Sequence, residues 1–243
     1  MEYRQVLYQN YFKNHLGKRS GLEYKIQFEK EKKQFKNDLE PILSKLKKEG
    51  QYFDSGCGTG SLLMTLLELG FKNLSGVDIS SGQIEVAKSF GLNQVEQGDA
   101  LSFLKTTKKK FDGIFAMDFI EHLSKNELIK YFNHIQESLQ HEGFLICRTP
   151  NADAPISSIY SYGDASHETI FNKKSLEQFL ISCGFKEVLV FPSSIYAGGG
   201  PKAFIRRILY PGYLFFRKFS LFLNGYSNKE VVHSPNLVVY ARK

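Results

Sequence analysis

From residue 51 onward, the hydrophobic positions of the chain follow two alternating patterns. Short apolar runs predict β-strands, and the stretches between them, whose apolar residues recur every three or four positions, predict α-helices. The expected strands are 51–55, 73–78, 93–97, 111–117, 143–148, 185–191 and 236–241, and the expected helices are 61–69, 80–90, 124–140 and 175–183. Strands that alternate with helices indicate an α/β fold, with a largely parallel sheet that is covered on both faces.

Three segments interrupt this alternation, at residues 1–50, 149–174 and 193–235. A long connection inside a compact domain usually has a function, and these segments are expected to close over the open end of the sheet. We therefore expect four parts, which are an N-terminal helical cap at 1–50, an α/β core at 51–192, a helical insertion at 193–235 and a final core strand at 236–243.

The two outer segments are expected to be helical. In the first, an apolar stripe at helical spacing predicts an amphipathic helix, and Pro41 should break or kink it; the stripe consists of Phe28, Phe35, Leu39, Ile42 and Leu46. In the second, two short apolar helices, each with a basic pair, are expected within 203–223 on either side of Pro211-Gly212. Basic amphipathic helices rich in Phe and Leu can lie in a membrane interface. The alternatives are a cap or a homodimer face, with arginines that extend to solvent.

The composition limits the class of protein. With 243 residues, 42% of them hydrophobic, the chain can bury a full core, so a disordered protein is not expected. Its three cysteines, Cys57, Cys147 and Cys183, form no C-x-x-C pair, so neither a disulfide framework nor a zinc site is indicated. The first residues do not resemble a signal peptide, and no uncharged apolar run reaches ~18 residues. A cytoplasmic location, with peripheral contact to the inner face of a membrane as a further option, is the expectation.

The net charge of +7 comes mostly from one segment. Residues 13–48 contain eleven Lys and Arg against five Asp and Glu, a balance of +6. Such a segment could bind nucleic acid. Because its apolar stripe accounts for the same residues as one helix with a solvated basic face, the sequence favours that interpretation, and a nucleic-acid partner is not expected.

The most informative motif is a glycine turn. Residues 54–60 read Asp-Ser-Gly-Cys-Gly-Thr-Gly, after an apolar strand and before a predicted helix. A strand that turns into a helix aims backbone N–H groups at one point, and glycines let a ligand approach the main chain. Asp78 ends the next strand about 20 residues later, where an acid can hold ribose hydroxyls. Ser61 stands where a dinucleotide fingerprint requires a third glycine, so a nucleoside ligand is favoured without a pyrophosphate.

At these residues the chain resembles the class I S-adenosylmethionine-dependent methyltransferases. The resemblance implies a Rossmann-like fold, with a seven-stranded, mostly parallel sheet, an antiparallel last strand and helices on both faces. It also implies S-adenosyl-L-methionine as the cofactor. Asp99, at the end of the third strand, matches the acid that meets the adenine amine. The cofactor-binding residues that we expect are Asp54, Gly56, Cys57, Gly58, Gly60, Asp78, Ile79, Asp99, Ala100, Met117 and Asp118.

The element Glu121-His122-Leu123 after the fourth strand resembles a subgroup that methylates small molecules. Residues 148–151 and 166–168 are similar to a narrower group, which is associated with capsule and O-antigen polysaccharide genes. This resemblance implies an oxygen of a sugar or surface-polysaccharide precursor as acceptor, or a phosphate or phosphoramidate oxygen. A hydroxyl loses its proton as it attacks, so a base with a pKa near 7 helps. We expect His167 as this base and His122 as the second candidate.

Two alternatives remain open at the sequence level. Divalent metal binding would use Asp118, Glu121, His122 and His167, but no spacing signature indicates a metal site, and none is predicted. The alternative acceptor is RNA, bound by the basic N-terminal region, or another small molecule. The chain lacks the Asn/Asp-Pro-Pro-Tyr/Phe tetrad of enzymes that methylate exocyclic amines of bases.

Overall fold

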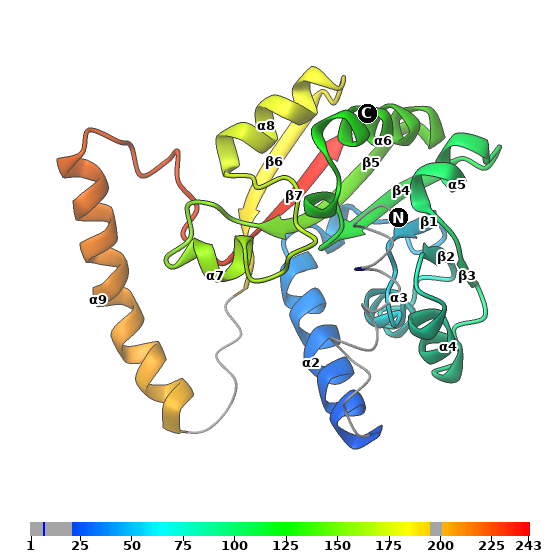
Figure 1. Cartoon of the computed structure of the whole chain (residues 1–243), viewed down its shortest axis with the longest axis horizontal. Coiled ribbons are helices and arrows are strands. Elements are labelled where there is room, and N and C mark those ends of the chain that lie inside the picture. Colours follow the sequence, from blue (N-terminus) through cyan, green and yellow to red (C-terminus); the bar gives the residue numbers. More distant parts are fainter. Residues whose placement is uncertain (1–6, 8–20, 195–200) are drawn as a thin grey trace.

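A computed structural model describes residue 7, residues 21–194 and residues 201–243. Residues 1–6 and 8–20 of the expected N-terminal cap therefore lie outside the described residues. A seven-stranded sheet forms the centre of the molecule, in the order β3-β2-β1-β4-β5-β7-β6 (Figure 1). Its strands are β1 Gln51–Ser55, β2 Asn73–Asp78, β3 Val95–Gln97, β4 Phe111–Met117, β5 Leu139–Pro150, β6 Glu187–Pro192 and β7 Asn236–Arg242.

The direction of the strands confirms the expected fold. Strands β1 to β5 pair in parallel, and β7 runs antiparallel to both β5 and β6. The chain starts at β1 in the middle, moves outward through β2 and β3, and returns to the other side of β1 at β4. In an open α/β sheet, ligands bind beyond the carboxyl ends of the strands at such a reversal.

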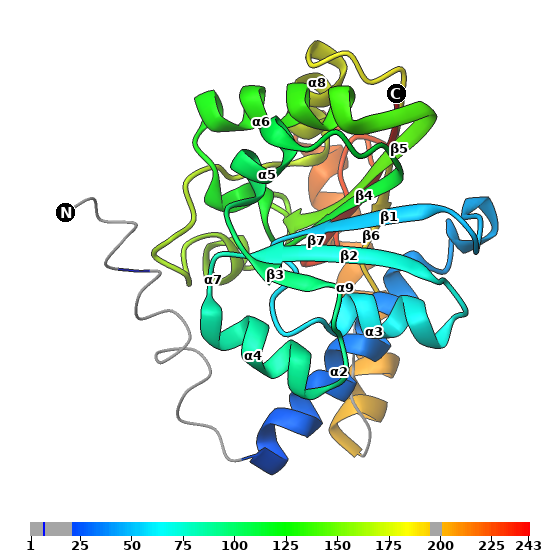
Figure 2. The ribbon, with the colours of Figure 1, turned by 90° about the vertical axis from the view of Figure 1, so that its right-hand side faces the viewer.

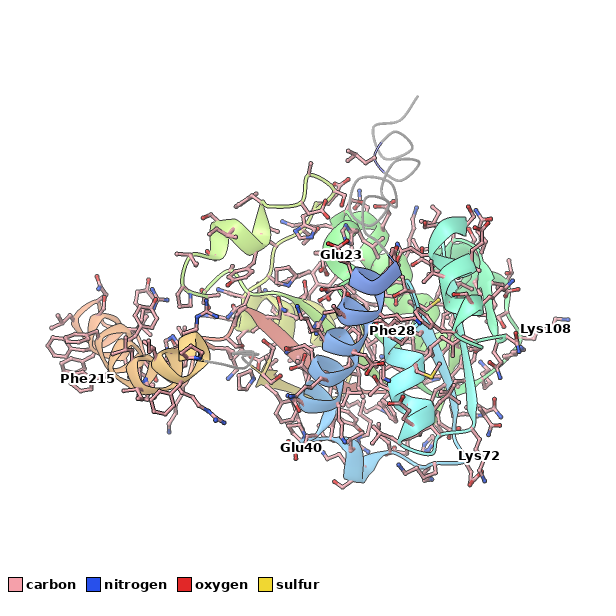
Figure 3. All side chains as sticks on the ribbon, turned by 90° about the horizontal axis from the view of Figure 1, so that it is seen from below. Glu23, Phe28, Glu40, Lys72, Lys108 and Phe215 are labelled. Atoms are coloured by element: carbon pink, nitrogen blue, oxygen red, sulfur yellow. The ribbon has the colours of Figure 1, made fainter. Side chains whose placement is uncertain are left out.

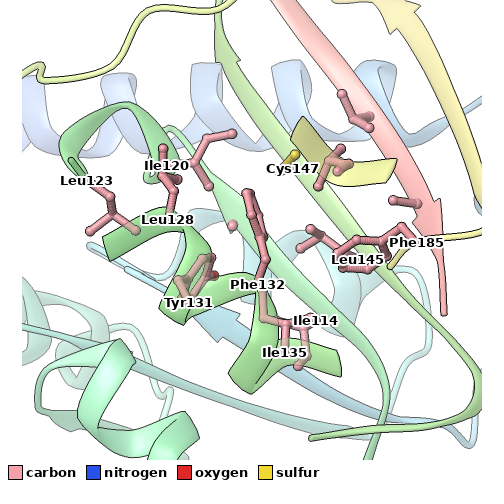
Figure 4. Close-up of a cluster of buried hydrophobic side chains, with 14 of the residues drawn as sticks. Ile114, Ile120, Leu123, Leu128, Tyr131, Phe132, Ile135, Leu145, Cys147 and Phe185 are labelled. Carbon is pink, nitrogen blue, oxygen red and sulfur yellow. The ribbon is translucent and has the colours of Figure 1, made fainter. Parts of the chain in front are cut away.

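Helices cover both faces of the sheet (Figure 2). One face carries α5 (Ala100–Thr106), α6 (Lys125–Ser138) and α8 (Lys173–Ser182), and the other carries α2 (Gly21–Leu39), α3 (Ser61–Glu68) and α4 (Ser81–Ser89). Figure 4 shows the first of the two cores, where α6 buries Leu128, Tyr131, Phe132 and Ile135. These residues follow helical spacing, so the sequence pattern identified this face correctly.

Local sequence signals explain several helix boundaries. Ser124 and Glu127 form a reciprocal capping box that starts α6. The predicted end of α6 at residue 140 was two residues too long, because Leu139 already begins β5. Helix α5 was missed altogether. Its start signal was present, since Asp99 caps the helix by accepting a hydrogen bond from Ser102 N at 2.9 Å.

Helix α2 has its predicted apolar face. All five residues of the stripe are buried, and α2 ends at Leu39, two residues before Pro41. A short 3-10 turn, η1 (Leu43–Lys45), then leads to β1. Phe28 stacks on Phe90 at the end of α4, with ring centroids 4.2 Å apart. Helix α2 is therefore anchored on the core, on the side of the glycine turn.

Helix α9 (Pro201–Leu223) corrects the sequence analysis. The chain forms one continuous helix with Pro211 inside it, in place of two short helices. An internal proline removes one backbone donor and costs about 3 kcal/mol, a cost that the residues on both sides can absorb without a break. In Figures 1 and 3 the helix stands apart from the sheet, and Figure 3 shows Phe215 on the side of the helix away from the sheet. The described helices include none that is long and apolar enough to span a membrane.

Candidate active site

The glycine turn after β1 adopts the conformation that its sequence requires. Gly56, Gly58 and Gly60 have φ angles of 70°, 54° and 82°, in the left-handed region that favours glycine. A Cβ atom at Gly60 would lie 2.1 Å from Leu92 Cδ1. The turn thus closes tightly onto α3 and α4 and leaves its backbone open on the other side.

Asp78 at the end of β2 holds this turn in place. Its Oδ2 atom accepts a hydrogen bond from Gly58 N at 2.9 Å, and Oδ1 accepts one from Ser80 N at 2.8 Å. Burial raises the pKa of Asp78, although these two hydrogen bonds act in the opposite direction. Each oxygen keeps a lone pair, so the carboxylate can also accept the ribose hydroxyls of a nucleoside.

Asp54, the acid that opens the motif, is fully buried. Within the described residues its Oδ1 atom has no hydrogen-bond partner. Burial raises the pKa of Asp54 well above its usual value, and the nearby charge of Asp78 raises it further. A positively charged group bound at the turn would compensate this carboxylate, and the amino-acid part of S-adenosylmethionine carries one.

A cavity of about 1110 Å³ lies in front of the turn, at the carboxyl ends of β1, β2 and β4. All the predicted cofactor residues line it except Gly60, which instead caps α3. Helix α2 contributes a wall of the cavity, formed by Tyr24, Gln27, Phe28, Glu31 and Phe35. The segment 1–50 was expected to close over the open end of the sheet, but nothing in the sequence indicated which of its side chains would reach the cavity.

Several predicted residues also have structural partners. The Asp99 carboxylate accepts hydrogen bonds from both the backbone N–H and the hydroxyl of Ser102, so its adenine contact stays a prediction. Cys57 is buried beneath the turn, and burial raises the pKa of its thiol, which suits a packing residue. Its backbone N–H donates to Val77 O at 2.9 Å and fixes the turn against β2.

Asp118 belongs to a buried ion-pair network. It follows β4 with a φ of 54°, and its Oδ1 atom accepts a hydrogen bond from Arg148 Nε at 2.8 Å. Arg148 Nη1 donates to Asp38 Oδ2 on α2 at 2.9 Å, and the guanidinium lies 4.5 Å from the ring centre of Phe35. The network joins α2, β4 and β5 along the cavity wall. Because Asp38 and Arg148 are 110 positions apart, no local pattern could have paired them.

Residues 148–151 carry the resemblance that implied a saccharide acceptor. In the structure, Arg148 and Asn151 form hydrogen bonds with other parts of the chain. Asn151 is fully buried, and its side-chain amide donates to the carbonyl groups of Val232 and Ser234. Its Oδ1 atom accepts a hydrogen bond from Asp153 N. Arg148 lines the cavity, whereas Asn151 is not part of its lining.

The structure brings His122 and His167 together. Their ring centres are 4.9 Å apart at an interplanar angle of 65°. His122 belongs to the 3-10 turn η2 (Ile120–His122) and lines the cavity, whereas His167 lies behind it and is not part of the lining. Burial lowers the pKa of His122, and the neighbouring His167 lowers it further.

Glu121 lies beside the two histidines and is 1% exposed. Burial raises the pKa of its carboxyl group well above the usual value, and the charge of Asp118 adds to the effect. The Thr149 hydroxyl is near this carboxylate. Within the described part of the chain, however, neither Thr149 Oγ1 nor Glu121 Oε2 has a hydrogen bond of acceptable geometry.

Known proteins share this sequence pattern and this fold. A family model described as a methyltransferase domain matches residues 27–190, more than half of the chain. The Bacillus subtilis protein YqeM, provisionally named a methyltransferase, is 30% identical over 114 residues, which are 43% of this chain. The chain spans about 44% of the length of that curated relative.

Solved structures extend the comparison to nearly the whole fold. An S-adenosylmethionine-dependent methyltransferase from Archaeoglobus fulgidus superposes with a TM-score of 0.65 at 21% identity, over 90% of this chain and 100% of its own. Magnesium protoporphyrin IX methyltransferase from Synechocystis, solved with bound S-adenosylhomocysteine, gives a TM-score of 0.56 at 14% identity, over 88% and 83%.

The family match covers the strand, glycine turn and acid that form the cavity. The observed features suit the cofactor, because the turn has open backbone, Asp78 has lone pairs for a ribose, and Asp54 lacks a partner for a buried oxygen. The chain therefore belongs to the methyltransferase-domain family and is a class I S-adenosylmethionine-dependent methyltransferase.

Proposed function

We propose that the protein transfers the methyl group to an oxygen atom of a sugar or surface-polysaccharide precursor. The observation that carries the oxygen acceptor is His122 in the lining of the cofactor cavity, with the ring centre of His167 4.9 Å from its own. S-adenosylmethionine supplies a methyl group activated by a positive sulfonium. Two imidazoles beside it suit an acceptor that must lose a proton, as a hydroxyl does.

The reaction is an in-line displacement. The acceptor oxygen forms a bond to the methyl carbon while the carbon–sulfur bond breaks, and the electron pair stays on sulfur. The hydroxyl proton leaves to solvent or to a side chain of the site. His122 lines the cavity and His167 does not. We therefore assign the contact with the acceptor to His122, and His167 contacts the ring of His122. A phosphate or phosphoramidate oxygen, already anionic, would need no proton acceptor.

Helix α9 supports an acceptor held at a membrane, such as a lipid-linked precursor. Its apolar side chains recur at helical spacing and are exposed, with 65% exposure at Phe215 and 70% at Phe222. The full exposed set is Phe204, Ile205, Ile208, Leu209, Tyr213, Phe215, Phe216, Phe219, Phe222 and Leu223. Because the helix is continuous, Arg206-Arg207 and Arg217-Lys218, eleven positions apart, recur on a common face after three turns. An apolar face opposite a cationic one is typical of helices that lie in an anionic lipid interface.

The RNA alternative rests on the basic charge of residues 13–48. Helix α2, the main described part of that segment, gives it little support. This helix contains five lysines and four acidic residues, so its described surface is nearly neutral. Its apolar face is used for packing on the core. No feature of the described residues favours RNA over a small or membrane-bound acceptor.

The test of the acceptor is a methyl-transfer screen with isotopically labelled S-adenosylmethionine. The acceptors are nucleotide-sugars, sugar phosphates, short lipid-linked saccharides in vesicles, RNA oligonucleotides and small amines. Mass spectrometry of the product should locate the label on an oxygen of a saccharide. Transfer to RNA or to an amine, with the saccharides unmodified, would refute the proposal.

A separate experiment tests the role of α9. Vesicles of phosphatidylcholine with anionic phosphatidylglycerol should sediment the wild-type protein, and added salt should release part of it. The double substitution Phe215→Ser and Phe219→Ser should abolish sedimentation. The control Ile181→Ser, on an exposed position of α8, should not. Loss of a dimer in the double variant, with unchanged lipid binding, would identify α9 as a subunit interface instead.

A further inference from the structure

We propose that Glu121, His122 and His167 bind one divalent transition-metal ion beside the cofactor cavity. Each residue offers one ligand atom, and these atoms all lie within 4.8 Å of one another. Among the described residues this is the one place where three such side chains gather. Asp118, the fourth residue of this neighbourhood, is held by Arg148 and is not part of the group.

The hydrogen bonds of the two histidines determine which nitrogen faces the proposed ion. His167 Nδ1 lies 2.9 Å from the Ser161 carbonyl oxygen, which can only accept, so Nδ1 carries the hydrogen. The Ser166 hydroxyl donates to Asp164 Oδ1 at 2.6 Å, so the same oxygen accepts from His122 Nδ1 at 3.0 Å. In the neutral rings, both lone pairs are therefore on Nε2. Metal-binding histidines typically have this arrangement, with the second nitrogen donating to a carbonyl or a polar side chain.

Glu121 provides the negative charge that such a site needs. Its side chain is almost fully buried, and no described group donates a hydrogen bond to Oε2. The negative charge of Asp118 also acts on this carboxylate, so an ionised Glu121 needs a compensating cation. A buried carboxylate oxygen without a hydrogen-bond donor is costly, and a bound cation would offset that cost.

The backbone sets the distance between the ligands. The Glu121 carbonyl oxygen accepts hydrogen bonds from Glu168 N at 2.8 Å and Thr169 N at 3.0 Å. The Thr169 hydroxyl donates to Leu123 O at 2.7 Å in a buried position. The loop that carries His167 is thus fastened to the turn that carries Glu121 and His122. The three ligands are preorganised although 45 positions separate the histidines.

The chemistry of the ligands indicates the class of metal. Two imidazoles and one carboxylate suit Zn²⁺, Mn²⁺, Co²⁺ or Fe²⁺, whereas Mg²⁺ and Ca²⁺ prefer oxygen ligands alone. Three protein ligands leave coordination positions open. Since His122 lines the cavity, an acceptor hydroxyl could bind there and lose its proton more easily. This role rests on the proposed function, whereas the metal site itself does not.

The test is metal binding by the full chain, purified without an affinity tag and stripped with a chelator. Titration with Co²⁺, followed by visible absorption, should give one equivalent and a spectrum with nitrogen ligands. Zn²⁺ should displace it. Glu121→Gln, which keeps the size of the side chain, should weaken Co²⁺ binding at least tenfold. Ser166→Ala removes the nearer acceptor of His122 Nδ1, at 3.0 Å, and leaves the Ser166 carbonyl oxygen at 3.4 Å, so it should weaken Co²⁺ binding by about tenfold, the lower end of the usual effect.

His141→Ala is the control, because this histidine side chain is 93% exposed and belongs to no such cluster of described residues. It should bind Co²⁺ like the wild type. Thermal melting and circular dichroism establish that each variant is folded. If Glu121→Gln is not folded, His167→Asn replaces it as the variant that lacks one ligand. Absence of binding in the wild type, or equal binding in Glu121→Gln and wild type, would overturn the site.

These measurements need no acceptor, so they stand if the saccharide proposal fails. The role in transfer is tested by activity alone. The stripped enzyme should be inactive and should recover with Mn²⁺, Zn²⁺ or Co²⁺, and a full rate without metal would overturn that role.

Discussion

Replacing Arg148 with methionine should destabilise the protein and loosen its cofactor cavity. Arg148 is 7% exposed and bridges Asp38 on α2 and Asp118 after β4. The Asp38 side chain is fully buried, whereas that of Asp118 is 43% exposed. After the substitution, water can solvate Asp118, but the charge of Asp38 remains buried without its cation.

The magnitude follows from this asymmetry. Removing one partner of a buried ion pair typically costs about 3–5 kcal/mol, because the other charge stays desolvated. Asp38 keeps one hydrogen bond, from Ser194 N at 2.6 Å, and a second from Gln34, so the lower half of that range is expected. For a chain of this size, with an m-value of about 3 kcal/mol/M, the urea midpoint should fall by about 1.0–1.3 M.

Urea unfolding of four proteins tests the reasoning. Arg148→Met should unfold at lower urea than the double variant Arg148→Met with Asp38→Asn, because the second substitution removes the stranded charge. Lys72→Met is the matched control. Lys72 pairs with Glu49 at 3.0 Å, but both side chains are about 70% exposed, so the cost should stay below about 1 kcal/mol. A double variant as unstable as the single variant would refute the explanation from Asp38. Calorimetry should also show weaker S-adenosylmethionine binding, since α2 forms one cavity wall.

Three further predictions concern the glycine turn and its acids. Gly58→Ala should weaken S-adenosylmethionine binding about tenfold in calorimetry, since its φ is 54° and the new Cβ would lie 2.9 Å from Gln83 Oε1. Gly70→Ala, at φ 89° with open space around it, should lower stability only; equal affinities for the two variants would contradict this. Asp78→Asn replaces one accepting oxygen with a donor that faces a backbone N–H, and should reduce affinity about 10- to 100-fold; wild-type affinity would exclude the ribose role. Asp54 has a pKa raised above the usual 3.8, so the unfolded chain releases its proton first and the free energy of unfolding falls as pH rises from about 4 toward the folded pKa. Asp54→Asn should make this slope smaller in urea titrations without cofactor, whereas Asp78 and Glu121, whose pKa values burial also raises, keep part of it; the same pH dependence in Asp54→Asn and in the wild type would contradict the explanation.

Much of the fold could be predicted because its signals are local. The boundaries of β1, β2 and β4 follow from apolar runs that end at a glycine turn or an acid. The amphipathic spacing of α2 and α6 identified buried faces correctly. Helix α5 and the continuity of α9 were not predicted, because α5 is short and proline signals a break only on average.

The sequence by itself indicated a nucleoside site, and its resemblance to the class I methyltransferases implied the cofactor. Three glycines at alternate positions and an acid at the next strand end are short-range features, and a turn of this conformation follows from the absence of Cβ atoms. It also placed His122 at a strand end. Only the tertiary structure decided what surrounds these residues. It paired Asp38 with Arg148, laid α2 over the cavity, and brought Glu121 and His122 against His167. The reason is physical: these contacts join side chains that are distant in sequence, and burial and sheet order, which no short window contains, select them.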